Sequence, residues 1–140
     1  MVMEQLAVEI VGLCREYGEC RVEAERMEEA RRVKNALESV CSMARQRLDI
    51  SDPALLLALL DACEVTRDEG MLQEVLDVVG RNLDRLAVSA ESVKLLAYCY
   101  YYVEEEECVE RAGRMLEELR KMGRGEEELA DVETILEELT

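Results

Sequence analysis

The sequence contains no histidine, no phenylalanine and no tryptophan, and it has one proline among 140 residues. Histidine is the commonest general acid–base group and a frequent metal ligand, so its absence argues against most hydrolytic and zinc-dependent chemistry. The chain also lacks a glycine-rich phosphate loop and a serine-nucleophile motif. We therefore expect that the protein is not an enzyme and that it holds no cofactor and no metal.

The residues that are present favour helices. Ala, Leu, Glu, Arg and Met dominate, and these are the residues with the highest helix propensity. No segment shows the sustained alternation of apolar and polar residues that is typical of a strand. The sequence predicts an all-α protein whose core is built from aliphatic residues, Met and Cys, with Tyr as its one aromatic residue.

Six cysteines are present, and none of them forms a C-x-x-C pair. Cys14, Cys41, Cys63 and Cys99 lie within apolar helical patterns, where a free cysteine packs as a small hydrophobic residue. We expect free thiols in a reducing cytoplasm, with disulfides as the alternative. Glu4 interrupts the apolar run at the N-terminus, and no stretch of about 20 apolar residues exists, so neither a signal peptide nor a membrane span is expected.

The charge is strongly acidic, with 33 acidic residues against 17 basic ones and a net charge of −16. Such a balance disfavours binding to nucleic acid, whose phosphates need a surplus of Lys and Arg. It favours a basic partner. The main basic concentration lies between Arg21 and Arg47, where interleaved glutamates at helical spacing indicate pairs within the helix rather than a nucleic-acid surface.

Apolar periodicity and helix-ending residues predict about seven helices. The first covers residues 2–17 and ends at Gly18. A charged run over residues 19–28 is either a loop or the start of the second helix, which continues to Leu48. The third begins at Pro53, capped by Asp52.

The remaining helices are predicted in the same way. Thr66 and Glu69 have the spacing of a capping box for the fourth helix, which carries Leu76 as a core residue and reaches Leu86. The fifth is capped by Ser89 and ends in the run of four glutamates at 104–107. The sixth covers residues 108–122, and a closing helix covers residues 126–139.

Two stretches of the chain repeat the same apolar pattern with a shift of 37 residues. The first contains Leu56, Leu59, Leu60, Cys63, Leu72, Val75 and Val79, and the second contains Val93, Leu96, Ala97, Tyr100, Val109, Ala112 and Leu116. The first two helices fit the same pattern with an 11-residue insertion around residues 18–28. We predict a single domain over residues 1–140, made of three antiparallel helical hairpins at about 2–49, 52–87 and 89–122, with the helix 126–139 capping the stack.

Residues 52–122 resemble the tetratricopeptide and pentatricopeptide class of helix-hairpin repeats. The resemblance rests on the large, small and aromatic positions held by Leu96, Ala97 and Tyr100 and by their equivalents in the preceding unit. The period of 37, the large Leu60 at a small position and the missing closing proline depart from the class. A stack of HEAT-like pairs and a compact helical bundle are the alternatives.

The resemblance implies a concave face lined by the first helix of each hairpin. Its outward positions carry the candidate partner-binding residues, which are Arg15, Asp61, Glu64, Lys94, Tyr98, Tyr101 and Tyr102. Four of the five tyrosines fall within residues 98–102, and successive residues of a helix point about 100° apart, so not all of them can be buried. We expect Tyr100 to be buried and the others to be partly exposed. The alternative is that two or three of the tyrosines fill the core in place of Phe and Trp.

These observations predict a protein-interaction module, acting as an adaptor, a chaperone or an assembly subunit, that binds a basic or amphipathic partner protein. One alternative is an RNA-binding helical repeat, which the net charge disfavours. Another is a structural subunit of an all-α oligomer. A homo-oligomer is open as well.

Overall fold

The computed structural model describes residues 3–123 and 126–139, and this part of the chain contains helices and no strand. Seven α-helices follow one another, which confirms the all-α prediction. They are α1 (Met3–Cys20), α2 (Met27–Arg45), α3 (Pro53–Thr66), α4 (Glu69–Arg81), α5 (Ala90–Val103), α6 (Glu106–Lys121) and α7 (Glu126–Leu139), with short 3₁₀ turns at Ala24–Arg26 and Leu83–Arg85.

The 37-residue repeat is visible in the ends of the helices. Helices α3 and α5 begin and end at positions 37 residues apart, and α4 and α6 begin 37 residues apart. Both α3 and α5 are followed by a residue in the left-handed conformation, Arg67 with φ 55° and Glu104 with φ 52°. The two stretches therefore share a backbone pattern as well as an apolar pattern.

The predicted caps of these two helices are confirmed. The carboxylate of Asp52 accepts a hydrogen bond of 3.2 Å from the backbone N–H of Leu55, and Pro53 occupies the first position of α3. The hydroxyl of Ser89 accepts one of 3.1 Å from the N–H of Ser92. Each cap satisfies a backbone donor that the first turn of a helix leaves without a partner.

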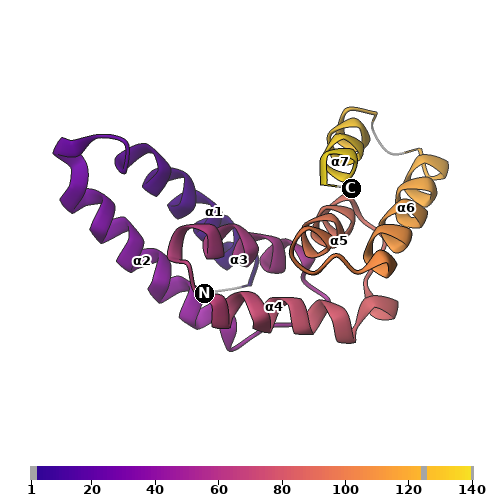
Figure 1. Cartoon of the computed structure of the whole chain (residues 1–140), viewed down its shortest axis with the longest axis horizontal. Helices are drawn as coiled ribbons and strands as arrows, with labels where there is room; N and C mark the ends of the chain where they lie inside the picture. Colours follow the sequence, from indigo (N-terminus) through magenta and orange to yellow (C-terminus); the bar gives the residue numbers. More distant parts are fainter. Residues whose placement is uncertain (1–2, 124–125, 140) are drawn as a thin grey trace. The chain divides into compact units, whose positions relative to one another are not determined.

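The chain divides into two compact units within α4, Met1–Val75 and Leu76–Thr140. In the first unit, α1 and α2 pack against each other as an antiparallel pair, and α3 packs against both (Figure 1). Leu6, Ile10, Leu37, Leu56 and Leu59 are fully buried and form the aliphatic centre of this unit.

The second unit has the same order of packing. Helix α5 packs against α6 and α7, and α6 also contacts α7 (Figure 1). Val93, Leu96, Ala112, Leu119 and Val132 are buried. The predicted middle hairpin over residues 52–87 crosses the division between the units, so the single continuous stack stays a prediction.

The predicted ends of three helices are wrong. Helix α2 ends at Arg45 and not at Leu48, and α4 ends at Arg81 and not at Leu86. Helix α1 continues past Gly18 to Cys20, because Cys20 is buried with Ala30, and Leu13 and Tyr17 pack against them. This small cluster extends the α1–α2 pair into the predicted insertion. The charged run itself forms a 3₁₀ turn before α2 begins at Met27.

The predicted capping box at Thr66 is also wrong. Thr66 is the last residue of α3, and its hydroxyl donates to the carbonyl of Ala62 at 3.0 Å. Asp68 accepts from the N–H of Met71 at 3.0 Å and therefore caps α4. Leu76, predicted as a core residue, is half-buried, whereas Val75 next to it is buried.

Candidate functional site

The predicted partner-binding residues are divided between the two units. Three lie in the first unit, Arg15 on α1 and Asp61 and Glu64 on α3. The other four lie on α5 in the second unit, and they are Lys94, Tyr98, Tyr101 and Tyr102. Each unit therefore carries its own set of candidate residues.

The tyrosines of α5 form the surface in the second unit, which we call the tyrosine surface and define by Tyr98, Tyr101 and Tyr102. Tyr101 is 58% exposed, and Tyr98 and Tyr102 are half-buried. The rings of Tyr101 and Tyr102 meet edge to face, with centroids 5.2 Å apart and planes at 78°. This arrangement places the positive edge of one ring on the negative face of the other and holds both at the surface.

One expectation about this cluster is wrong, because Tyr100 is half-buried rather than buried. Helix α5 still buries its apolar side through Val93, Leu96 and Ala97. Tyr98, Tyr100 and Tyr102 are each half-buried, so a contribution of two or three tyrosines to the core stays the alternative interpretation.

Carboxylates follow the tyrosine surface directly. Helix α5 ends at Val103, Glu104 takes the left-handed conformation, and the next helix begins at Glu106. The four glutamates of residues 104–107 are all exposed. The N–H of Glu104 donates to the carbonyl of Tyr100 at 2.7 Å, which fixes the direction in which the chain leaves the helix.

The first unit holds an apolar groove between α1 and α3, which we call the α1–α3 groove. It has a volume of about 400 Å³ and is lined by Ala7, Val8, Val11, Gly12, Arg15 and Ala54. Val8 is 74% exposed, although its side chain is wholly aliphatic. The helical periodicity of the sequence predicts Arg15 on this face. It does not predict the groove, because the distance between two helices is set by packing and not by periodicity.

The two helices that form this groove run in the same direction. Ala54 lines the groove together with Ala7 at one end. Seven positions later on each helix, the carboxylate of Asp61 lies close enough to Cys14 to raise the pKa of its thiol, in addition to the effect of burial. Parallel first helices of successive hairpins are the arrangement expected in a repeat stack.

Charge is distributed unevenly around the groove. Asp61 keeps part of its side chain in water, yet burial of the rest raises its pKa, and the neighbouring Glu64 raises it further. Arg15 is exposed, and no carboxylate of the described residues forms an ion pair with it. In the described part of the chain, the groove thus ends in a cation without an ion-pair partner, although the chain as a whole is strongly negative.

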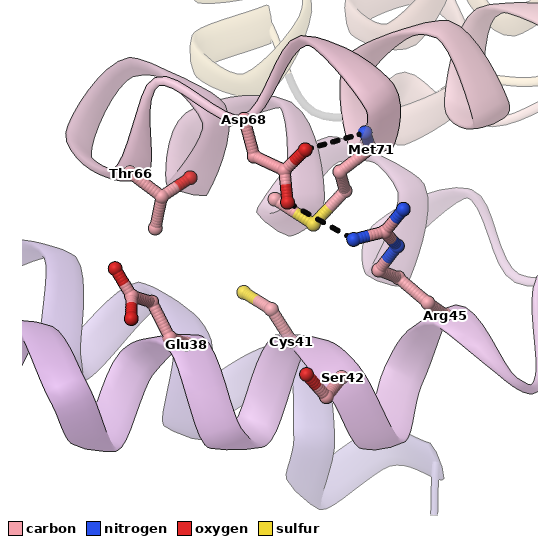
Figure 2. Close-up of a pocket in the computed structure, with 7 residues that line it drawn as sticks. All are labelled: Glu38, Cys41, Ser42, Arg45, Thr66, Asp68 and Met71. Atoms are coloured by element: carbon pink, nitrogen blue, oxygen red, sulfur yellow. Dashed lines mark hydrogen bonds and ion pairs between the residues drawn. The ribbon is translucent and has the colours of Figure 1, made fainter.

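A second cavity of the first unit is polar and has a volume of about 370 Å³. It lies between α2 and the turn that joins α3 to α4, and its lining residues are Glu38, Cys41, Ser42, Arg45, Thr66, Asp68 and Met71 (Figure 2). Figure 2 shows Arg45 reaching from α2 to Asp68, whose other oxygen accepts from the backbone of Met71. Because Arg45 also binds Glu74, the polar groups at this end of the cavity are occupied by one another.

The cysteines are free, and all but the half-buried Cys14 are buried. Burial is the largest cause that raises their pKa values, to about 11 for Cys14 and to about 12 for Cys41, Cys63 and Cys99. A thiol with such a pKa is almost wholly protonated near neutral pH and is a poor nucleophile and a poor metal ligand. These side chains act as hydrophobic core residues.

In the described residues, no three of the groups His, Cys, Asp and Glu converge in a way that could hold a metal ion. None of the described helices has the length and the apolar character that crossing a bilayer requires. Comparisons with protein-family models, with curated proteins and with solved structures found no match. The tyrosine surface and the α1–α3 groove are therefore the features from which a function can be inferred.

Proposed function

We propose that the protein is an interaction module that binds a basic segment of a partner protein, as an adaptor, a chaperone or an assembly subunit of a reducing compartment such as the cytoplasm. The observation that carries the proposal is the edge-to-face pair of the exposed Tyr101 and the half-buried Tyr102, which four exposed glutamates follow directly along the chain. Tyrosine is enriched at protein interfaces because its ring buries apolar area while its hydroxyl stays hydrated.

The chemistry of this surface favours Lys or Arg side chains in the partner. A cation over the face of a tyrosine ring gains about 0.5–1 kcal/mol at an exposed site. The carboxylates of residues 104–107 add attraction at longer range, and the net charge of −16 speeds the approach of a basic segment. The aromatic pair supplies contact area, and the surrounding charge supplies selectivity.

The proposal is tested with a fluorescently labelled peptide rich in Lys and Leu, whose binding to the full chain is followed by anisotropy. Tyr101→Ala should weaken binding at least about tenfold, which is roughly 1.4 kcal/mol, while the helical circular-dichroism spectrum is kept. Met122→Ala is the matched control, because Met122 is an equally large apolar residue of the second unit that is 62% exposed. Equal affinities for the wild type and Tyr101→Ala would contradict the proposal.

The two alternative functions are examined with the same protein. A mobility shift with mixed RNA at low salt that exceeds peptide binding would favour an RNA-binding repeat. A concentration-dependent oligomer in sedimentation velocity that Tyr101→Ala disperses would favour a structural subunit.

Added salt should slow association with the basic peptide, because the steering charges are screened beyond about 10 Å at 0.1 M ionic strength.

A further inference from the structure

We infer that the α1–α3 groove is a second docking site, which takes the apolar ridge of an amphipathic helix from a partner protein and pairs a carboxylate of that helix with Arg15. The inference goes beyond the proposed function, because it concerns a different unit, a different surface and the opposite sign of local charge. It rests on the exposure of Val8, on the space at Gly12 and on the exposed Arg15, which pairs with no carboxylate of the described residues.

The apolar part of the groove has the size of a short helical ridge. Val8 and Arg15 lie seven positions apart on α1, which is about 10 Å, or two helical turns. Val8 and Val11 are both exposed, and the small Ala7 and Ala54 leave the space between the helices open. Exposure of an aliphatic surface of this kind to water is unfavourable, so a partner that covers it gains binding free energy.

Gly12 allows a partner to come close. A Cβ atom built at Gly12 would meet no other atom within 4 Å, so packing inside the chain does not require glycine there. Glycine inside a helix is destabilising by about 0.5–1 kcal/mol relative to alanine. The absence of a side chain at this position opens the floor of the groove next to Val8 and Val11.

Arg15 identifies the chemistry at the end of the groove. Among the described residues its guanidinium forms no ion pair, and the pKa of Asp61 on α3 is raised by burial and by Glu64. A carboxylate on the occupant, two turns from its first aliphatic side chain, would reach Arg15 when the ridge lies on Val8. Arginine binds carboxylates through two parallel hydrogen bonds, which sets the register of the occupant.

The net charge decides between a partner and a second copy of this chain. Two chains of −16 repel each other, whereas a helix that is basic overall and has one carboxylate on its apolar ridge is attracted to the protein and still satisfies Arg15. The occupant is therefore a helix of a different protein, with aliphatic residues one turn apart, a single Asp or Glu on the same face, and Lys or Arg on the opposite face.

The test uses the full chain and two capped peptides of Ala and Lys, about 14 residues long, with two leucines one turn apart. The peptides differ only at the position two turns after the first leucine, which is Glu in one and Gln in the other. We expect the Glu peptide to bind about threefold more tightly. Arg15→Gln should remove this preference, and a preference that persists in this variant would overturn the inference.

Val8→Asp should weaken both peptides at least about tenfold. Val22→Asp is the matched control, because Val22 is 75% exposed in the same unit and does not line the groove. Equal losses in the two variants, or no binding up to about 1 mM peptide, would overturn the inference. Gly12→Gln fills the same groove from an open position and replaces Val8→Asp if that variant loses its helical spectrum.

Two further measurements separate this site from the tyrosine surface and from self-association. Tyr101→Ala should leave the affinities of both peptides unchanged, so that failure of the groove and failure of the proposed function are read independently. Sedimentation velocity should show the same species for the wild type and Val8→Asp. A dimer that Val8→Asp disperses would overturn the inference, because a second copy would then cover the groove.

Discussion

The guanidinium of Arg45 on α2 donates two hydrogen bonds to the carboxylate of Glu74 on α4, with distances of 2.6 and 3.0 Å. A third bond of 2.9 Å reaches Asp68, the residue that caps α4. One side chain thus ties the beginning of α4 to α2 across 29 residues of sequence. Because two carboxylates share a single cation, its removal leaves two negative charges close together.

We expect Arg45→Met to lower the free energy of unfolding by about 1 kcal/mol, because a bidentate network at a partly exposed site lies at the upper end of surface ion pairs. Urea unfolding followed by circular dichroism measures the change. The control is Arg32→Met, whose pair with Glu28 is 3.8 Å long and highly exposed, and which should change stability far less. Equal effects would show that Arg45 does not hold α4.

The same pair predicts a dependence on pH. The hydrogen bonds from Arg45 hold the pKa of Glu74 below its ordinary value in the folded protein. The contribution is therefore fully present above the unfolded pKa of a glutamate and is lost as the pH falls through the lowered folded value. Stability curves measured between about pH 3 and pH 7 should be shallower for Arg45→Met than for the wild type. Parallel curves would contradict the assignment.

Asp61 predicts a pH dependence of stability that is opposite in sign to that of Glu74. Burial and Glu64 raise its pKa, so its charged form is destabilising in the folded state, and this penalty grows as the pH rises through the raised value. Asp61→Asn should stabilise the protein by a few tenths of a kcal/mol at pH 7, since the site is partly exposed. The gain should vanish at low pH, where wild-type Asp61 is neutral. A gain of equal size at all pH values would point to another cause.

The two left-handed residues predict stabilising substitutions. In the left-handed conformation, the Cβ atoms of Arg67 and Glu104 are sterically unfavourable by roughly 1–2 kcal/mol, whereas glycine has no Cβ. Arg67→Gly and Glu104→Gly should each raise the free energy of unfolding by about 0.5–1 kcal/mol after the entropy of the unfolded chain is counted. Gly80→Ala should do the same for the opposite reason, because a Cβ there meets nothing within 4 Å and helix propensity improves. Thermal unfolding of the three variants tests whether each of them is more stable than the wild type.

The different burial of two leucines predicts two losses of stability of different size. Leu59→Ala should lower the free energy of unfolding by about 2–5 kcal/mol, because Leu59 is fully buried in the first unit. Leu76→Ala should cost less, because Leu76 is half-buried. Denaturant unfolding of the two variants gives the comparison. A larger loss at Leu76 would mean that the buried side of α4 has been misidentified.

The sequence predicted the helices well because their signals are local. The caps at Asp52 and Ser89 and the 37-residue repeat were found from residue types and spacing alone. The end at Gly18 was missed because the cluster around Cys20 extends α1, so that a contact with another element overrides the local preference. The cap at Thr66 was missed because Asp68, two residues later, caps α4 instead, and sequence spacing did not distinguish the two neighbouring capping residues.

The candidate surfaces were predicted less completely. Outward positions of helices can be read from periodicity, and so Arg15 and Tyr101 were placed on the surface correctly. The α1–α3 groove depends on how far apart two helices pack, and the edge-to-face pair of Tyr101 and Tyr102 depends on side-chain rotamers. Neither is encoded in a pattern along a single helix. Tyr100 was expected to be buried because its repeat position is apolar, but it is half-buried.

The concentration of tyrosines on α5 gives the protein an uneven optical signature. In the absence of tryptophan, all intrinsic fluorescence comes from five tyrosines, and four of them lie in the second unit, while Tyr17 alone reports on the first. Emission is therefore a nearly selective signal for one half of the chain, whereas circular dichroism sees both halves. If the two signals change at different denaturant concentrations, the units unfold separately, and native tyrosine emission alone would show when the surface on α5 is occupied.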